Sequence, residues 1–268
     1  MKPPGDEFYI GWQDRAPAST GRRLRWVVAG LIGSALVLGA ILSLGQRTIG
    51  PGGFEFGRLR SFSGVFVSRP YPHLLVPRPG GVAAPGVETN STYYLVAPWK
   101  FGLPEALAKK WDGHAVQLQG TLIYRRSQTM VEVVLDSLRA ATNAAPAAGT
   151  GPDFAGAGFA LGRHTLVGEI VDSKCFLGVM NPGQLAPHRA CAIRCISGGV
   201  PPVLVVRSAE GGVFYVLLVS AQGEPVNQAV LAYVAEPVAI TGELSRHGEW
   251  LELRADPATI RRVSAAQP

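Results

Sequence analysis

The stretch Val116–Leu122, VQLQGTL, returns 122 residues later as Val238–Leu244, VAITGEL. In both copies apolar and polar residues alternate up to a glycine, which is the pattern of a half-buried β-strand. Tyr94–Val96 and Tyr215–Leu217 repeat in the same way at an offset of 121 residues. Repetition at a nearly fixed distance indicates that one structural unit occurs twice in this chain of 268 residues.

The two copies differ in the spacing of their first strands. Gly57-Arg58 and Ser63–Val65 match Gly162-Arg163 and Val167–Glu169 at an offset of only 104 to 105 residues. The second copy therefore carries about 17 extra residues between its first strand and its middle strands. All three cysteines of the chain lie in this insert.

Each copy predicts short strands with a brief helix before the fourth, an order that resembles the OB-fold, a small five-stranded Greek-key barrel. The resemblance covers most of residues 55–140 and 160–262, and it implies a fold without implying a function. The expected strands are Leu59–Val67, Thr92–Ala97, His114–Tyr124, Met130–Leu135, Thr165–Val171, Val203–Val206, Val213–Val219, Val238–Leu244 and Trp250–Arg254. A proline in the first turn favours the expected helices, Pro104–Trp111 and Pro225–Val234.

A membrane span precedes the barrels. Trp26–Leu44 is free of charge, and its 19 residues would extend roughly 28 Å as a helix, close to the thickness of a bilayer. Arg22, Arg23 and Arg25 come just before it and Arg47 just after it, so the positive-inside rule places the N-terminus in the cytoplasm. A cleaved signal peptide is the alternative, but the length of the stretch and the lack of a clear A-x-A site favour an anchor.

The predicted protein is therefore mainly β: an N-terminal transmembrane helix, then two tandem OB-like barrels, the second bearing a Cys/His helical insert. We expect a single pass through the inner membrane with periplasmic C-terminal domains. The expected segments are a cytoplasmic arm (1–25), the transmembrane helix (26–45), the first OB-like domain (46–142), an Ala/Gly/Pro linker (143–159) and the second OB-like domain (160–263) with its insert (172–200).

Composition and charge narrow the function classes. Charged residues make up 16% of the chain, below the usual share, which excludes a disordered polyelectrolyte. Residues 47–140 carry a net charge of +5 and residues 160–268 a net charge of zero. OB-folds often bind single-stranded nucleic acid, but the expected export leads us to predict no nucleic-acid partner. The expected partners are the membrane and another membrane protein or complex.

The insert contains the residues with the clearest chemistry. Pro187 can open a helix and Gly198 can end one in the left-handed conformation. His188, Cys191 and Cys195 then fall at i, i+3 and i+7, on one helical face. Cys175 arrives from the end of the preceding strand and can meet that face. Three thiolates and an imidazole form a four-ligand set for a transition metal such as zinc or copper.

Three other residues are candidates for supporting roles. Met180 can supply a thioether if the metal is copper(I). Asp172 can orient His188 as a carboxylate behind the ligand. His164 becomes relevant only if the fold brings it beside Cys175. We expect the remaining histidines, His73, His114 and His247, to be solvated.

Two alternatives to a metal site stay open. In an oxidising compartment Cys175 can form a disulfide with Cys191 or Cys195, which leaves one thiol over. Alternatively the thiols serve thiol–disulfide exchange or metal transfer, with Lys174, Arg189 and Arg194 as nearby positive charges.

The strings D-x-K-C-F (172–176), H-x-x-C-A-x-x-C (188–195) and G-G-x-P-P (198–202) resemble a signature of uncharacterised membrane-anchored bacterial proteins, and this resemblance implies no activity. No nucleophile with a base at a recognisable spacing occurs, which favours a non-catalytic role. The sequence predicts an extracytoplasmic binding or accessory protein that holds a metal and assists a respiratory or cofactor-assembly complex. The alternatives are a thiol–disulfide or metal-transfer protein and a structural interaction subunit with one disulfide.

Overall fold

A computed structural model describes residues 17–47, 52–78, 90–141, 158–208 and 211–264. The chain divides into two units, residues 1–50 and 51–268. The first unit contains one helix, α1 (Ala18–Arg47). Its segment Thr20–Gly45 is long and apolar enough to cross a membrane. The most apolar window of this segment has a mean hydropathy of 2.4, and none of its residues is buried. The predicted N-terminal span is thus present as a helix, while most of the predicted arm lies outside the described residues.

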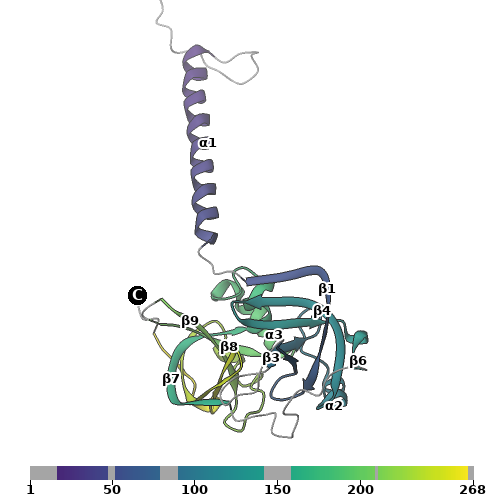
Figure 1. The fold of residues 1–268 in the computed structure, drawn as a ribbon. Helices are drawn as coiled ribbons and strands as arrows, with labels where there is room; N and C mark the ends of the chain where they lie inside the picture. The colour runs from purple at the N-terminus through teal and green to yellow at the C-terminus, as the bar shows by residue number, and fades with distance from the viewer. Residues whose placement is uncertain (1–16, 48–51, 79–89, 142–157, 209–210, 265–268) are drawn as a thin grey trace, which may run out of the picture. The chain divides into compact units, whose positions relative to one another are not determined.

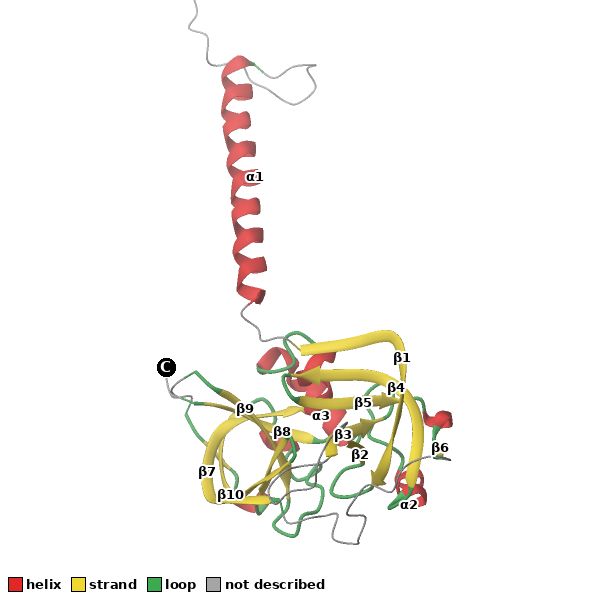
Figure 2. Cartoon of the chain, in the orientation of Figure 1, coloured by secondary structure: helices red, strands yellow, loops and turns green. Residues whose placement is uncertain are grey.

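The first barrel begins the second unit, and strands dominate it (Figure 2). Its strands pair in the order β1-β2-β3-β5-β4, and β4 pairs back onto β1, so the sheet closes. β3 and β5 run parallel, whereas the other neighbours run antiparallel, as in an OB-fold. The elements are β1 (Gly52–Val67), β2 (His73–Pro77), β3 (Asn90–Val96), α2 (Glu105–Trp111), β4 (Ala115–Arg125), β5 (Gln128–Val133), the 3₁₀ turn η1 (Leu135–Ser137) and β6 (Arg139–Ala140).

The second barrel repeats this pairing, with the order β7-β8-β9-β11-β10 and closure of β10 onto β7 (Figure 1). Its insert lies between β7 and β8. The barrel elements are β7 (Phe159–Asp172), β8 (Pro202–Arg207), β9 (Val213–Val219), η5 (Leu231–Tyr233), β10 (Pro237–His247), β11 (Trp250–Arg254), η6 (Pro257–Thr259) and β12 (Arg261–Arg262). The insert consists of a π-helical turn, η3 (Cys175–Val179), a 3₁₀ turn, η4 (Ala186–His188), and the helix α3 (Arg189–Ser197). The predicted fold class is confirmed: a mainly β chain with one apolar helix and two OB-like barrels.

One repeated glycine has the same structural cause in both copies. A Cβ at Gly64 in β1 would lie 2.3 Å from the carbonyl oxygen of Leu75. A Cβ at Gly168, the equivalent residue of β7, would lie 2.4 Å from the carbonyl oxygen of Val205. In each barrel the first strand therefore passes too close to the second strand for any residue with a side chain.

The two barrels share a hydrophobic core. Tyr94 of β3 packs edge-on against Trp250 of β11, with ring centroids 4.6 Å apart. The hydroxyl of Tyr71, ahead of β2, donates to the carbonyl oxygen of Leu218 in β9 and accepts from the N–H of Val226. These contacts cross from one barrel to the other, so the two barrels, as far as the structure describes them, pack as one body. The predicted domain limits at 46–142 and 160–263 remain predictions, and most of the predicted linker lies outside the described residues.

Three expectations about elements need correction. The segment Pro225–Val234 is not a helix but turns followed by η5, because the amide of Asn227 is engaged with the end of α3, where it donates to the carbonyl oxygens of Ile196 and Val200. β2 was not predicted, because its five residues lie between prolines that mask the strand pattern. His73 at its start is buried rather than solvated, and its Nδ1 donates to the carbonyl oxygen of Tyr71.

The end of α3 also differs in detail from its prediction. Gly198 has a right-handed conformation, with a φ of −80°, and the left-handed residue is its neighbour Gly199, with a φ of +100°. Gly198 is required for another reason, because a Cβ there would lie 2.1 Å from the carbonyl oxygen of Lys100. The loop after β3 in the first barrel therefore lies directly against the end of α3.

Candidate metal centre

Asp172, the last residue of β7, is the polar centre of the insert. Its side chain is fully buried. One carboxylate oxygen, Oδ1, accepts the backbone N–H of Cys175 at 2.7 Å and thereby caps the helical turn that carries the cysteine. The other oxygen, Oδ2, lies 2.9 Å from Nε2 of His188. A single carboxylate thus fixes the positions of two of the predicted ligands.

Packing against the first barrel holds the π-helical turn η3 in place. Phe176 lies between the guanidinium of Arg125, 4.6 Å from its ring centroid, and the ring of Tyr215, 4.9 Å away. Gly178 lies so close to the backbone of Gly53 in β1 that a Cβ would come within 2.3 Å of its carbonyl oxygen. Cys175 is therefore positioned by contacts with both barrels.

The helix α3 carries the other two cysteines, as the spacing predicted. His188 lies at the start of α3, Cys191 in its first turn and Cys195 in its last. Before this helix, the backbone N–H of Leu185 donates to the carboxylate of Glu169 in β7, which anchors the loop that leads into it. Burial raises the pKa of Glu169, although the hydrogen bond from Leu185 acts in the opposite direction.

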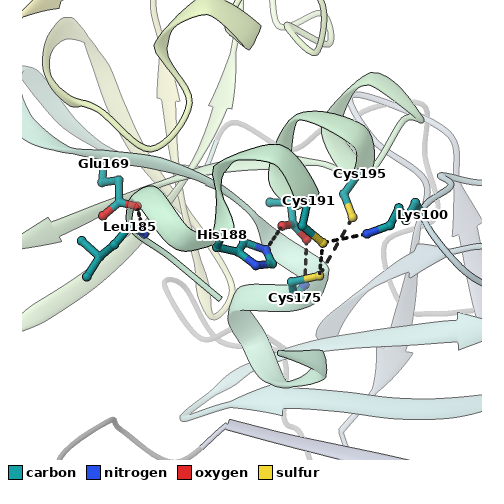
Figure 3. Close-up of polar contacts among 8 residues, drawn as sticks. Lys100, Glu169, Cys175, Leu185, His188, Cys191 and Cys195 are labelled. Atoms are coloured by element: carbon teal, nitrogen blue, oxygen red, sulfur yellow. Dashed lines mark hydrogen bonds and ion pairs between the residues drawn. The ribbon is translucent and has the colours of Figure 1, made fainter. Parts of the chain in front are cut away.

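The ligand atoms converge, as Figure 3 shows. Sγ of Cys175 lies 4.0 Å from Sγ of Cys191 and 4.0 Å from Sγ of Cys195. A ring nitrogen of His188 lies within 4.8 Å of the sulfur atoms of Cys175 and Cys191. In a tetrahedral zinc–thiolate site with Zn–S bonds of about 2.3 Å, two sulfur atoms are about 3.8 Å apart. The two separations from Cys175 are therefore close to those of thiolates that share one metal ion.

The four predicted ligands do not all lie equally close to one another. Cys175, His188 and Cys191 form one group within 4.8 Å, while Cys195 belongs to a second group with Cys175 and Asp172. Cys175 is common to both groups. Since Nε2 of His188 faces Asp172, Nδ1 is the nitrogen left to bind a metal, in the arrangement usual for ligating histidines.

The other two supporting candidates are not part of this cluster. His164 is exposed on β7, and its Nε2 hydrogen-bonds with the carbonyl oxygen of Leu161. Met180 donates its backbone N–H to the carbonyl oxygen of Cys175, but its side chain is 44% exposed. Among the three supporting residues, Asp172 is the one whose side chain hydrogen-bonds to a predicted ligand.

Two charged residues that the sequence did not single out lie at the cluster. Nζ of Lys100, in the loop after β3, donates to Sγ of Cys191 at 2.7 Å. Glu132 of β5 forms an ion pair with the buried Lys174 at 2.5 Å. Lys174 also donates to the carbonyl oxygens of Ala97 and Trp99 and so holds the loop that contains Lys100. Both residues belong to the first barrel, about 90 and 40 residues from their partners Cys191 and Lys174, so no local sequence pattern could link them to the insert.

The thiols interact with one another electrostatically. The hydrogen bond to Cys195, followed by burial, raises the pKa of Cys175 well above its ordinary value. The same hydrogen bond lowers the pKa of Cys195, against the effect of burial.

The predicted disulfide is not formed. All three cysteines are free thiols, and the 4.0 Å separations are about twice a sulfur–sulfur bond length. The helix explains this for Cys191 and Cys195, because both side chains are fixed on one rigid face.

The comparisons with known proteins support no assignment to a family. No protein-family model and no curated protein matches the chain. Among solved structures, the wild-type single-stranded DNA binding protein from Thermus aquaticus is 14% identical, with a TM-score of 0.22 and coverage of 81% of this chain and 96% of that one. A deletion mutant of the same protein is 13% identical, with a TM-score of 0.21 and coverage of 81% and 97%. Because these identities and TM-scores are so low, the assignment of the OB-like fold rests on the strand order of the chain itself.

One expectation about partners is corrected by this comparison. The sequence analysis excluded nucleic acid, yet the matching structures are single-stranded DNA binding proteins. The exclusion therefore does not stand. The low TM-scores equally give no argument that this chain binds DNA.

Proposed function

We propose that the chain is a membrane-anchored extracytoplasmic accessory protein that holds one transition metal ion through Cys175, His188, Cys191 and Cys195. The observation that carries this proposal is the pair of 4.0 Å sulfur separations about Cys175, beside a buried histidine held by Asp172. Thiolate-rich sets select zinc and copper(I) over harder metals. A bound ion would supply a structural link or a cargo for transfer, in the service of a respiratory or cofactor-assembly complex.

The charges around the cluster support a bound cation. Three thiolates, a neutral imidazole and a divalent ion carry a net charge of −1, and the ammonium group of Lys100 lies beside one of the sulfur atoms. The carboxylate of Asp172 is positioned to accept the Nε2–H of His188 and so to stabilise the tautomer whose Nδ1 binds. The ammonium group of Lys100 therefore offsets the net charge of the thiolates and a divalent ion, while the carboxylate of Asp172 is held by hydrogen bonds.

Metal content tests the proposal directly. The full chain is purified in detergent without a histidine tag, under anaerobic and reducing conditions, and analysed for metals. We expect one zinc or copper ion per chain, lost in Cys175→Ser and retained in Ser197→Ala, which changes an exposed residue of the same helix. Absence of any stoichiometric metal, including after incubation with zinc or copper(I), would overturn the proposal.

The extracytoplasmic location is a separate part of the proposal. It is supported by the apolar segment Thr20–Gly45 and by the arginines that precede its most apolar part. An alkaline phosphatase fused to the C-terminus should be active, because that enzyme folds in oxidising compartments. An inactive fusion, in cells where the same fusion on an exported control is active, would place the barrels in the cytoplasm.

A second function is favoured by the contact between Lys100 and Cys191. Cys191 is partly exposed, and a cation lies 2.7 Å from its sulfur, which is the environment of thiols that exchange with disulfides. In such an exchange Cys191 would attack a partner disulfide, and Cys175 would then displace the partner's thiol. Alkylation followed by mass spectrometry distinguishes the two functions, because exchange requires a Cys175–Cys191 pair that cycles between thiols and a disulfide.

A further inference from the structure

The contact between Lys100 and Cys191 is closer than a hydrogen bond to sulfur requires. Nζ and Sγ are 2.7 Å apart. That distance is at the short limit of N–H···O bonds, about 2.7 Å, although sulfur is a larger atom than oxygen. A single oxygen atom bonded to both would span such a gap, whereas a direct bond between nitrogen and sulfur would require a shorter one.

The backbone on both sides holds this pair together. Lys174 binds the carbonyl oxygens of Ala97 and Trp99 just before Lys100. Just after Lys100, the N–H of Gly102 donates to the carbonyl oxygen of Gly198 at 2.9 Å. Cys191 is on the helix α3 that ends at that contact. The packing of the loop against the helix therefore places the backbone of Lys100 where its exposed side chain reaches Cys191.

Lys100 lies next to the cysteine cluster, and Cys191 is the most accessible of the three thiols. The hydrogen bond to Cys191 raises the pKa of Lys100, as do the charges of Cys195, Cys191 and Cys175. Cys175 and Cys195 are 4% and 1% exposed, whereas Cys191 is partly exposed. An oxidant from solvent therefore reaches Cys191 first, next to the lysine nitrogen (Figure 3).

We propose that oxidation joins Lys100 and Cys191 through a covalent N–O–S bridge, which makes the pair a redox-sensitive modification site. The ammonium first releases one proton to solvent. The amine and the thiol then combine with one molecule of dioxygen: one N–H bond, the S–H bond and the O=O bond break, one oxygen forms an N–O and an O–S bond, and the other forms two O–H bonds and leaves as water. Nitrogen and sulfur are oxidised, and dioxygen is reduced. Two molecules of a dithiol, each oxidised to a cyclic disulfide, supply the four electrons and four hydrogens that reverse the change and return the amine, the thiol and a further molecule of water.

The bridge and the metal exclude each other. Cys191 is one of the proposed ligands, and a sulfur bonded to oxygen is no longer a thiolate. Oxidation would therefore release the metal and tie the loop of the first barrel to the helix of the insert. This consequence rests on the proposed function, but the formation of the bridge does not.

The test uses the full chain in detergent, stripped of metal by a chelator and exposed to air. The intact mass should rise by one oxygen less two hydrogens. Proteolysis should yield one linked species that contains the peptides of Lys100 and Cys191, and dithiothreitol should separate them. Lys100→Arg keeps the positive charge and should lose the linked species, whereas Lys109→Arg, at an exposed lysine of the same barrel, should retain it.

Two results would overturn the bridge. One is an oxidised chain that contains no linked Lys100–Cys191 peptides. The other is a loss of two hydrogens without a gain of oxygen, which would indicate a disulfide between Cys175 and Cys191. A parallel sample loaded with zinc separates the two proposals: protection by zinc supports the shared ligand, while a bridge that forms equally with and without bound zinc would contradict a role for Cys191 as a ligand.

Discussion

At the scale of single residues, Asp172 is the side chain that holds two of the proposed ligands. Its two oxygens hold Cys175 and His188, so it sets the position of one ligand and the tautomer of another. Asp172→Asn removes the negative charge with little change in size. We expect the affinity for zinc, measured by competition with a chromophoric chelator, to fall by about 10- to 100-fold. Asp136→Asn, at an exposed residue of the first barrel, should leave the affinity unchanged.

Lys174 has a structural role that the sequence did not indicate. It was predicted as a positive charge near the thiols, but its Nζ points to Glu132 and to the two carbonyl oxygens of the loop. Its side chain is 2% exposed, so removal of the charge leaves buried acceptors and a carboxylate without a partner.

Lys174→Met should therefore destabilise the second unit by roughly 3 kcal/mol. Denaturant unfolding followed by tryptophan fluorescence measures this change. Lys109→Met breaks an ion pair on the exposed face of α2 and should have little effect. An equal loss of unfolding free energy in both variants would show that the contacts of Lys174 with the loop do not stabilise the fold.

At the scale of elements, the sequence predicted most of the strands and the helix α3. Alternation and repetition are local signals, so residues such as Val116–Leu122 reveal their strand without knowledge of the rest of the chain. The placement of His188, Cys191 and Cys195 on one face was also predictable, because helical spacing fixes it. The 3₁₀ geometry of η5 and the burial of His73 depend instead on contacts with distant segments, as shown by the bonds from Asn227 to the end of α3.

The contact between the loop after β3 and the end of α3 is an element-scale feature with a clear test. A Cβ at Gly198 would lie 2.1 Å from the carbonyl oxygen of Lys100, and neither backbone can yield without loss of the bond from Gly102. Gly198→Ala should therefore cost about 1–3 kcal/mol of stability.

The substitution Gly198→Ala should also move Lys100 away from Cys191. We expect air oxidation of Gly198→Ala to give less of the linked Lys100–Cys191 peptide than the unchanged chain gives. Ser197→Ala, one residue earlier on the exposed side of the helix, serves as the control. Unchanged stability together with an unchanged yield of linked peptide would mean that this backbone contact does not position the lysine.

At the scale of the whole molecule, the two barrels depend on each other. Trp250 of the second barrel packs on Tyr94 of the first, and the site draws residues from both. The duplication was visible in the sequence because each copy keeps its own pattern. The shared core was not, because contacts such as that of Tyr71 with Leu218 join residues 147 apart without a periodic signal.

His73 gives this shared core a pH dependence. Burial lowers its pKa below the ordinary value of 6.5, and the proximity of His247 acts in the same direction, while Tyr71, Glu252 and Asp112 oppose it. The folded protein therefore keeps His73 neutral where the unfolded chain protonates it. The stability that depends on its neutral form is complete above pH 6.5 and is lost as the pH falls toward the pKa of the folded state.

We expect the free energy of unfolding to fall between neutral pH and about pH 5, and the fall to be smaller in His73→Asn, which keeps a donor for the carbonyl oxygen of Tyr71. Urea unfolding at the two pH values measures both changes. An identical pH dependence in the variant would assign the effect to other groups.

The central claim is that three thiolates and one imidazole bind a single metal ion, and a cobalt(II) titration of the reduced full chain in detergent tests it most directly. The account predicts saturation at one cobalt per chain, with the visible absorption of a tetrahedral ion and an ultraviolet thiolate-to-cobalt band. That band should weaken in each of Cys175→Ser, Cys191→Ser and Cys195→Ser, and zinc should abolish it. Saturation without a thiolate band, or a band that all three variants retain, would contradict the claim.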